Sequence, residues 1–123
     1  MHIFSIALGG ALGAVSRYYF GNVISRMIGG ALPYGTFSIN VIGCFFMGLL
    51  MTLIIERNLL PAEWRLFLCV GFLGGFTTFS SFGYDALMLL QEDRYAAALA
   101  YMGGSMFLGL IAAALGVVLA KAL

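Results

Sequence analysis

Long apolar runs alternate with short polar segments along the chain, and this alternation predicts four membrane-spanning helices. The expected spans cover residues 3–20, 35–55, 65–90 and 96–120. The segments between them read GNVISRMIGGALPY, ERNLLPAE and QEDRY, and they hold most of the charges and both prolines. A helix of about 20 residues crosses the hydrocarbon core of a bilayer. The pattern therefore indicates an all-α membrane protein with one domain over residues 1–123.

The composition agrees with this interpretation. Of 123 residues, 63% are hydrophobic and only 9% are charged, and the mean hydropathy is +1.05. A soluble domain carries roughly 25% charged residues, so this chain has too few charges to cover a surface that faces water. The first apolar run has no basic start, so we expect a retained helix rather than a signal peptide. With no extramembrane domain expected, the function should be carried out within the bilayer.

Basic residues fall equally on the two sides of the predicted bundle, because Arg57, Arg65 and Lys121 oppose Arg17, Arg26 and Arg94. An excess of Lys and Arg on one side normally sets the orientation of a membrane protein. Two interpretations remain open. Chance or lipid context fixes one orientation, or the chain inserts both ways and pairs as an antiparallel, dual-topology homodimer. The second arrangement would supply the inverted symmetry that many transporters obtain by internal duplication.

Polar side chains occur at membrane depth in two of the spans. Thr36 and Asn40 are four residues apart and share one helix face, and Tyr101 and Ser105 repeat this spacing. The Asn40 amide would cost several kcal/mol if it were unsatisfied in hydrocarbon. It must therefore face protein or a polar cavity, and a simple hydrogen bond to a neighbouring helix would also explain it.

The third span contains the stretch VGFLGGFTTFSSFG at residues 70–83, in which two glycines precede four hydroxyl side chains. This composition predicts a helix break within residues 74–80, near the middle of the bilayer, where irregular backbone must be buried or must line a cavity. Free carbonyls at a break suit a hard cation, and half-helix N-termini suit an anion. Phe79 and Phe82 could offer positively polarised ring edges to a small anion. The residues thus favour a small-ion pathway that prefers anions.

Other classes of function are disfavoured. A small dual-topology proton-coupled multidrug antiporter is the main alternative, but it would need a carboxylate within the membrane. A non-conducting assembly subunit would not need a helix break beside Asn40. No nucleophile–base constellation or nucleotide-binding loop is present, so we expect no enzyme activity and passive flow. Cys44 and Cys69 lie in apolar runs without histidines or C-x-x-C spacing, so small hydrophobes are expected there rather than metal ligands.

The motifs GGALGAVSRYY, GTFSINVIGCFFMG and GFLGGFTTFSSFGYD resemble the Fluc (CrcB) family of bacterial fluoride channels, and the resemblance covers nearly the whole chain. It implies a fluoride-selective channel in the bacterial plasma (inner) membrane that passively exports cytoplasmic fluoride. It also implies a dual-topology homodimer with two pores and a structural sodium ion at the centre of the interface. An organic cofactor or a nucleic-acid partner is not expected.

The resemblance also implies roles for single residues. The fluoride path would be lined by Thr36, Asn40, Phe79, Phe82, Tyr101 and Ser105. Backbone carbonyls of Gly74 and Thr77 would hold the sodium, and Arg17 would lie at the vestibule end and raise the local anion concentration. The chain departs from the family pattern at Gly83, which lacks a hydroxyl, and at Asp85, which replaces a longer glutamate.

Overall fold

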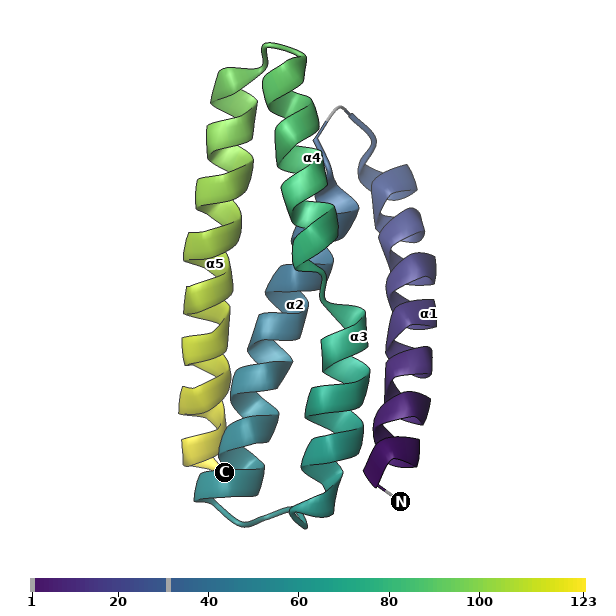
Figure 1. Cartoon of the computed structure of the whole chain (residues 1–123). Coiled ribbons are helices and arrows are strands. Elements are labelled where there is room, and N and C mark those ends of the chain that lie inside the picture. The colour runs from purple at the N-terminus through teal and green to yellow at the C-terminus, as the bar shows by residue number, and fades with distance from the viewer. Residues whose placement is uncertain (1, 31) are drawn as a thin grey trace.

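The computed structural model describes residues 2–30 and 32–123, and these residues form a bundle of helices (Figure 1). The first span is α1 (His2–Ile28), and the second is α2 (Tyr34–Met51) with the π-helix η1 (Thr52–Glu56). The third consists of the π-helix η2 (Arg65–Leu73), α3 (Gly74–Phe76) and α4 (Phe79–Gln91), and the fourth is α5 (Tyr95–Ala122). All four are long and apolar enough to cross a membrane. The prediction of an all-α protein with four apolar spans is confirmed.

Three spans begin and end within two residues of the predicted bounds, at 34–56, 65–91 and 95–122. The first helix differs, because it continues to Ile28 instead of ending near residue 20. Residues 21–28 contain no proline, and the helix ends only where Gly29 and Gly30 adopt φ of +69° and +86°. Glycine reaches this left-handed region without strain and commonly ends helices. Arg17 consequently lies inside α1 and not near its end.

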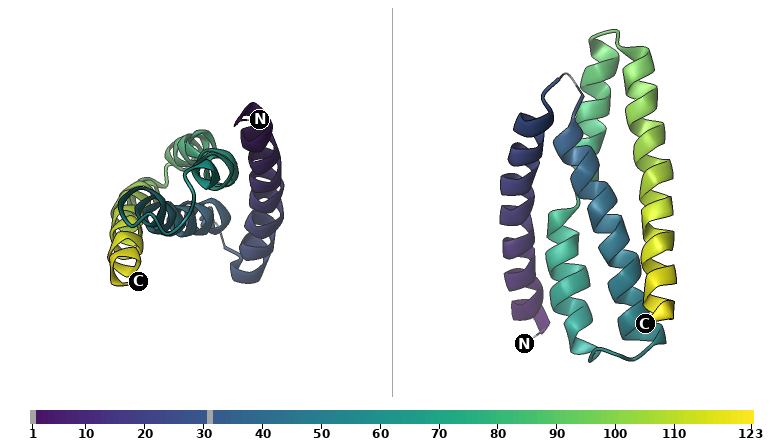
Figure 2. Two further views of the ribbon diagram at one scale, coloured as in Figure 1. Left: turned by 90° about the horizontal axis from the view of Figure 1, so that it is seen from below. Right: turned by 180° about the vertical axis from the view of Figure 1, so that it is seen from behind.

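The two halves of the third span have different neighbours. Figures 1 and 2 show the N- and C-termini at the same end of the bundle, and the third span crosses the bundle from one side to the other. Its first half, η2 with α3, packs against α1, and its second half, α4, packs against α5. The chain passes between these neighbours at Thr77 and Thr78.

Glycines allow α1 to approach the first half of the third span at backbone distance. A Cβ atom added at Gly75 would lie 2.6 Å from the Gly10 carbonyl oxygen, and one added at Gly13 would collide with the Phe72 carbonyl. Both contacts are to main-chain atoms, which cannot rotate away. These positions therefore accept only glycine unless the helices separate.

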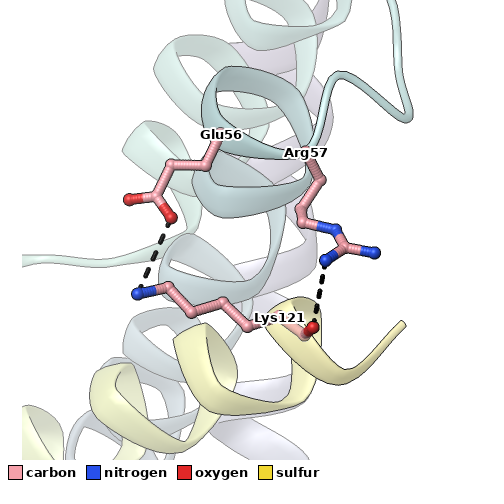
Figure 3. Close-up of polar contacts among 3 residues, drawn as sticks. All are labelled: Glu56, Arg57 and Lys121. Carbon is pink, nitrogen blue, oxygen red and sulfur yellow. Dashed lines mark hydrogen bonds and ion pairs between the residues drawn. The ribbon is translucent and has the colours of Figure 1, made fainter.

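Charged residues tie the end of the second span to the end of α5 (Figure 3). The Lys121 ammonium lies 3.8 Å from a Glu56 carboxylate oxygen, and Arg57 Nη1 donates to the Lys121 carbonyl oxygen at 3.1 Å. The Glu56 and Lys121 side chains are more than half exposed, so this ion pair contributes little to stability.

Candidate functional site

The helix of the third span is interrupted at two threonines. Thr77 has φ −84° and ψ 159°, and Thr78 has φ −149° and ψ 120°, so both are extended. Gly74 and Gly75, which the sequence singled out as helix-weakening, are helical. The Thr78 side chain caps the following helix, because its Oγ1 accepts a hydrogen bond from the Ser81 N–H at 3.1 Å. A threonine at this position is a favourable N-cap.

Asn40 satisfies both main-chain polar groups of Thr78. Its Oδ1 accepts from the Thr78 N–H at 2.8 Å, and its Nδ2 donates to the Thr78 carbonyl oxygen at 3.0 Å. Buried main-chain groups need such partners. The asparagine amide thus replaces the helical hydrogen bonds that the extended residue cannot make.

Because the helix is interrupted, two main-chain N–H groups bind other acceptors than the carbonyl groups they would reach in a continuous helix. In a continuous helix the Thr78 N–H would reach the Gly74 carbonyl, and the Ser81 N–H would reach the Thr77 carbonyl. Here the first binds Asn40 and the second binds Thr78 Oγ1. The carbonyls of Gly74 and Thr77 therefore lose their regular helical partners.

Arg17 attaches α1 to the same segment. Its Nε donates to the Gly75 carbonyl oxygen at 3.0 Å in a partly buried contact. This bond occupies only Nε, so the two terminal nitrogens of the guanidinium still have donors to offer. Arg17 is anchored beside the interruption.

A cavity of about 350 Å³ lies against the interruption. We call it the phenylalanine cavity. Thr78 lines it together with five of the predicted site residues, namely Asn40, Thr77, Phe79, Phe82 and Ser105. Ser105 Oγ is buried and has no hydrogen-bond partner in the described part of the chain. A buried hydroxyl without a partner is costly. It marks a place where a polar ligand would be stabilised.

Aromatic rings continue from this cavity to Tyr101. The ring centroids of Phe79 and Phe82 are 5.9 Å apart, and those of Phe82 and Tyr101 are 5.1 Å apart. Tyr101 is buried, and its hydroxyl donates to Asp85 Oδ2 at 3.4 Å. Asp85, one of the two residues that depart from the family pattern, is thus joined to the predicted site residue Tyr101 by a hydrogen bond.

Arg17 and Thr36 line a second cavity of about 200 Å³, which we call the arginine cavity. Thr78 lines both cavities and therefore lies between them. The arginine cavity also contains Asn22 and Ser25, which the sequence analysis missed because it ended the first span near residue 20. Their three-residue spacing places them on one face of α1, and this polar spacing is the signal that could have identified them.

The chain is similar to proteins of known family over nearly its full length. Residues 4–117 match the family described as "CrcB-like protein, Camphor Resistance (CrcB)". Three curated relatives carry the name "Fluoride-specific ion channel FluC". The one from Chloroflexus aurantiacus is 49% identical over 98% of this chain and 95% of its own length. The one from Thermus thermophilus is 48% identical over 96% and 94%, and that from Acidobacterium capsulatum is 46% identical over 92% and 90%.

Proposed function

Because the chain belongs to the CrcB family, we propose that it is a fluoride channel. It is a multi-pass bacterial membrane protein and not an enzyme. The names of the relatives support fluoride as the ion. The structural observation that carries the proposal is the phenylalanine cavity, where the buried Ser105 hydroxyl has no partner among the described residues.

The side chains of this cavity can replace the water that a small anion loses. Fluoride holds its hydration shell tightly, so it enters a narrow path only where other donors are available. Asn40 uses one of its two amide N–H groups on Thr78 and has the second to offer. The Ser105 hydroxyl can donate, and the rims of Phe79 and Phe82 are positively polarised.

Positive potential near the interruption favours anions further. The helix α4 begins at Phe79, so the positive end of its dipole lies beside the cavity. Arg17 adds a full positive charge in the arginine cavity, next to Thr78. We propose that this cavity collects fluoride before it passes Thr78.

We further propose that the carbonyls of Gly74 and Thr77 hold a sodium ion. The fit rests on chemistry, because their helical N–H partners bind elsewhere and free carbonyl oxygens suit a hard cation. In residues 2–30 and 32–123, no group of three or more His, Cys, Asp or Glu side chains could hold a metal ion instead. When bound, sodium would supply a fixed positive charge that favours nearby anions.

An antiparallel homodimer completes the proposal. Phe79 lines the candidate path, yet its side chain is 84% exposed in the single chain. A second copy packed against this face would enclose the ring. The equal numbers of Lys and Arg on the two sides of the bundle support insertion in both orientations.

The direction of flow needs no energy source in the protein. Hydrogen fluoride crosses membranes as a neutral weak acid and dissociates inside the cell. A membrane potential that is negative inside then drives the anion outward with about 2.3 kcal/mol per charge for each 100 mV. We propose passive export of fluoride on this basis.

The test is efflux from liposomes that contain the purified protein, first with fluoride and then with chloride, under an imposed potential. We expect fluoride to leave rapidly and chloride to be retained. Phe79→Ile and Asn40→Asp should slow the flux, because the first removes a ring edge and the second places negative charge in the path. Phe107→Ile is a matched control, since Phe107 is an exposed ring on α5 that lines neither cavity.

The alternatives give different results in the same assay. Equal passage of fluoride and chloride would contradict a fluoride-selective channel. Proton movement driven by a drug gradient would favour the multidrug antiporter. Absence of any flux from a folded, correctly inserted protein would favour the assembly subunit.

A further inference from the structure

Three sulfur-containing side chains line the phenylalanine cavity: Cys44 and Met47 of α2 and Met106 of α5. As companions for Cys44 in a metal site, the sequence analysis considered only cysteine and histidine side chains, and it found none. The companions are methionines, and one of them comes from a helix that is far away in the sequence. The fold therefore gathers a thiol and two thioethers at one cavity.

The geometry of α2 and α5 directs these groups toward one another. Cys44 and Met47 are three residues apart and share a helix face. The Cys44 Sγ lies 3.3 Å from the position that a Cβ of Gly109 would occupy on α5, so the thiol points at that helix. Met106 precedes Gly109 by three residues on α5 and shares its face. Met106 is largely exposed, and its flexible thioether is free to turn into the cavity.

We propose that these three side chains bind one soft monovalent metal ion, of the class of Cu(I) or Ag(I). Thiolate and thioether sulfur select soft ions of this kind over hard ions such as sodium. On binding, the metal ion replaces the thiol proton of Cys44, a sulfur–metal bond forms, and the proton leaves to water. The bound ion lies in the cavity that contains Phe79 and Ser105.

Occupancy of this site has a consequence that rests on the proposed fluoride channel. A metal ion in the phenylalanine cavity occupies space on the candidate fluoride path. It also draws the three sulfur-containing side chains together around it. We therefore expect silver to block fluoride flux. Silver fluoride is soluble whereas silver chloride precipitates, so the block can be measured in fluoride solutions without chloride.

Binding is tested first, independently of transport. Purified protein is titrated with Ag⁺ in chloride-free buffer. The number of Ag⁺ ions retained per chain is then measured by elemental mass spectrometry. We expect one tightly held Ag⁺ per chain, and Cys44→Ser should weaken binding about tenfold or more, which corresponds to about 1.4 kcal/mol. Cys69→Ser is the matched control, because Cys69 is a buried thiol of η2 that does not line the cavity.

Methionine variants keep the test valid if Cys44→Ser fails to fold. Met47→Leu and Met106→Leu preserve volume and remove only sulfur, so each should weaken Ag⁺ binding while the protein remains folded. Equal Ag⁺ affinity in the wild type, Cys44→Ser and both leucine variants would overturn the proposal. So would loss of the bound Ag⁺ in Cys69→Ser with retention in Cys44→Ser.

Flux is tested second, with each variant compared with its own silver-free rate. Wild type and Cys69→Ser should be inhibited by Ag⁺, and Cys44→Ser should resist. If silver binds at Cys44 but does not slow fluoride flux, the proposal that bound silver blocks the path is overturned. The channel proposal is then unaffected. If the wild type carries no fluoride at all, the proposed function fails, and the binding titration still decides whether the sulfur site exists.

Discussion

At the scale of single residues, Asn40 is the side chain on which the interruption of the third span depends. Replacement by alanine would leave the N–H and the carbonyl of Thr78 without their present partners. Each unsatisfied main-chain group costs about 1–3 kcal/mol, so we expect Asn40→Ala to lower the free energy of unfolding by at least about 2 kcal/mol. Chemical denaturation in detergent measures this loss.

Asn22→Ala is the control for this prediction. Asn22 is also an asparagine in a membrane-spanning helix, but its side-chain amide makes no hydrogen bond within residues 2–30 and 32–123. Its main-chain carbonyl accepts from Arg26 Nε at 3.3 Å, and this bond survives the substitution. We expect near-wild-type stability. Equal losses in the two variants would contradict the structural role assigned to Asn40.

The sequence predicted part of this residue-scale picture. An amide without a hydrogen-bond partner is costly in free energy in hydrocarbon, so the sequence predicted that Asn40 has such a partner. Sequence spacing does not identify this partner as Thr78, because the two residues are 38 positions apart. The same holds for the bond from Arg17 to Gly75, across 58 residues. Contacts between distant segments depend on how the helices pack, and helix packing cannot be predicted from a single sequence.

At the scale of the helices, the close approach of α1 to the third span positions the interruption. Gly13→Ala places a methyl group against the Phe72 carbonyl and pushes the helices apart. Overpacking of this kind lowers the free energy of unfolding by about 1–3 kcal/mol. The midpoint of the unfolding transition should therefore move to a lower denaturant concentration. The control is Gly103→Ala in α5, where an added Cβ meets nothing within 4 Å. A smaller loss in Gly13→Ala than in Gly103→Ala would contradict this packing.

The helical spans were more predictable than the geometry between them. Hydropathy, prolines and charges are local signals, and they located three of the four spans within two residues. The end of α1 was missed because Gly21 and Asn22 look like a turn in isolation, while the helix continues to Ile28. Residues 74–80 stood out by composition, but Gly74 remains helical and Thr77 and Thr78 are extended, since Asn40 supports the backbone there.

At the scale of the whole molecule, the balance of basic residues can be shifted deliberately. Leu59→Lys with Ala62→Lys adds two charges to the connection on the side of the termini. Gln91→Lys with Glu92→Lys adds two to the opposite side. Each pair breaks the equal count and should force one orientation, opposite in the two variants. Reporter fusions at the C-terminus measure the orientation.

An antiparallel dimer needs both orientations in one membrane, so each biased variant expressed alone should lose most of its fluoride flux. Expression of the two together should restore it, because each then supplies the partner that the other lacks. The pairs Leu59→Gln with Ala62→Gln and Gln91→Ser with Glu92→Gln change the same positions without adding positive charge and should conduct alone. Full flux from one biased variant in a single orientation would rule out the antiparallel arrangement, while the chemistry of the phenylalanine cavity would stand, since it is built within one chain.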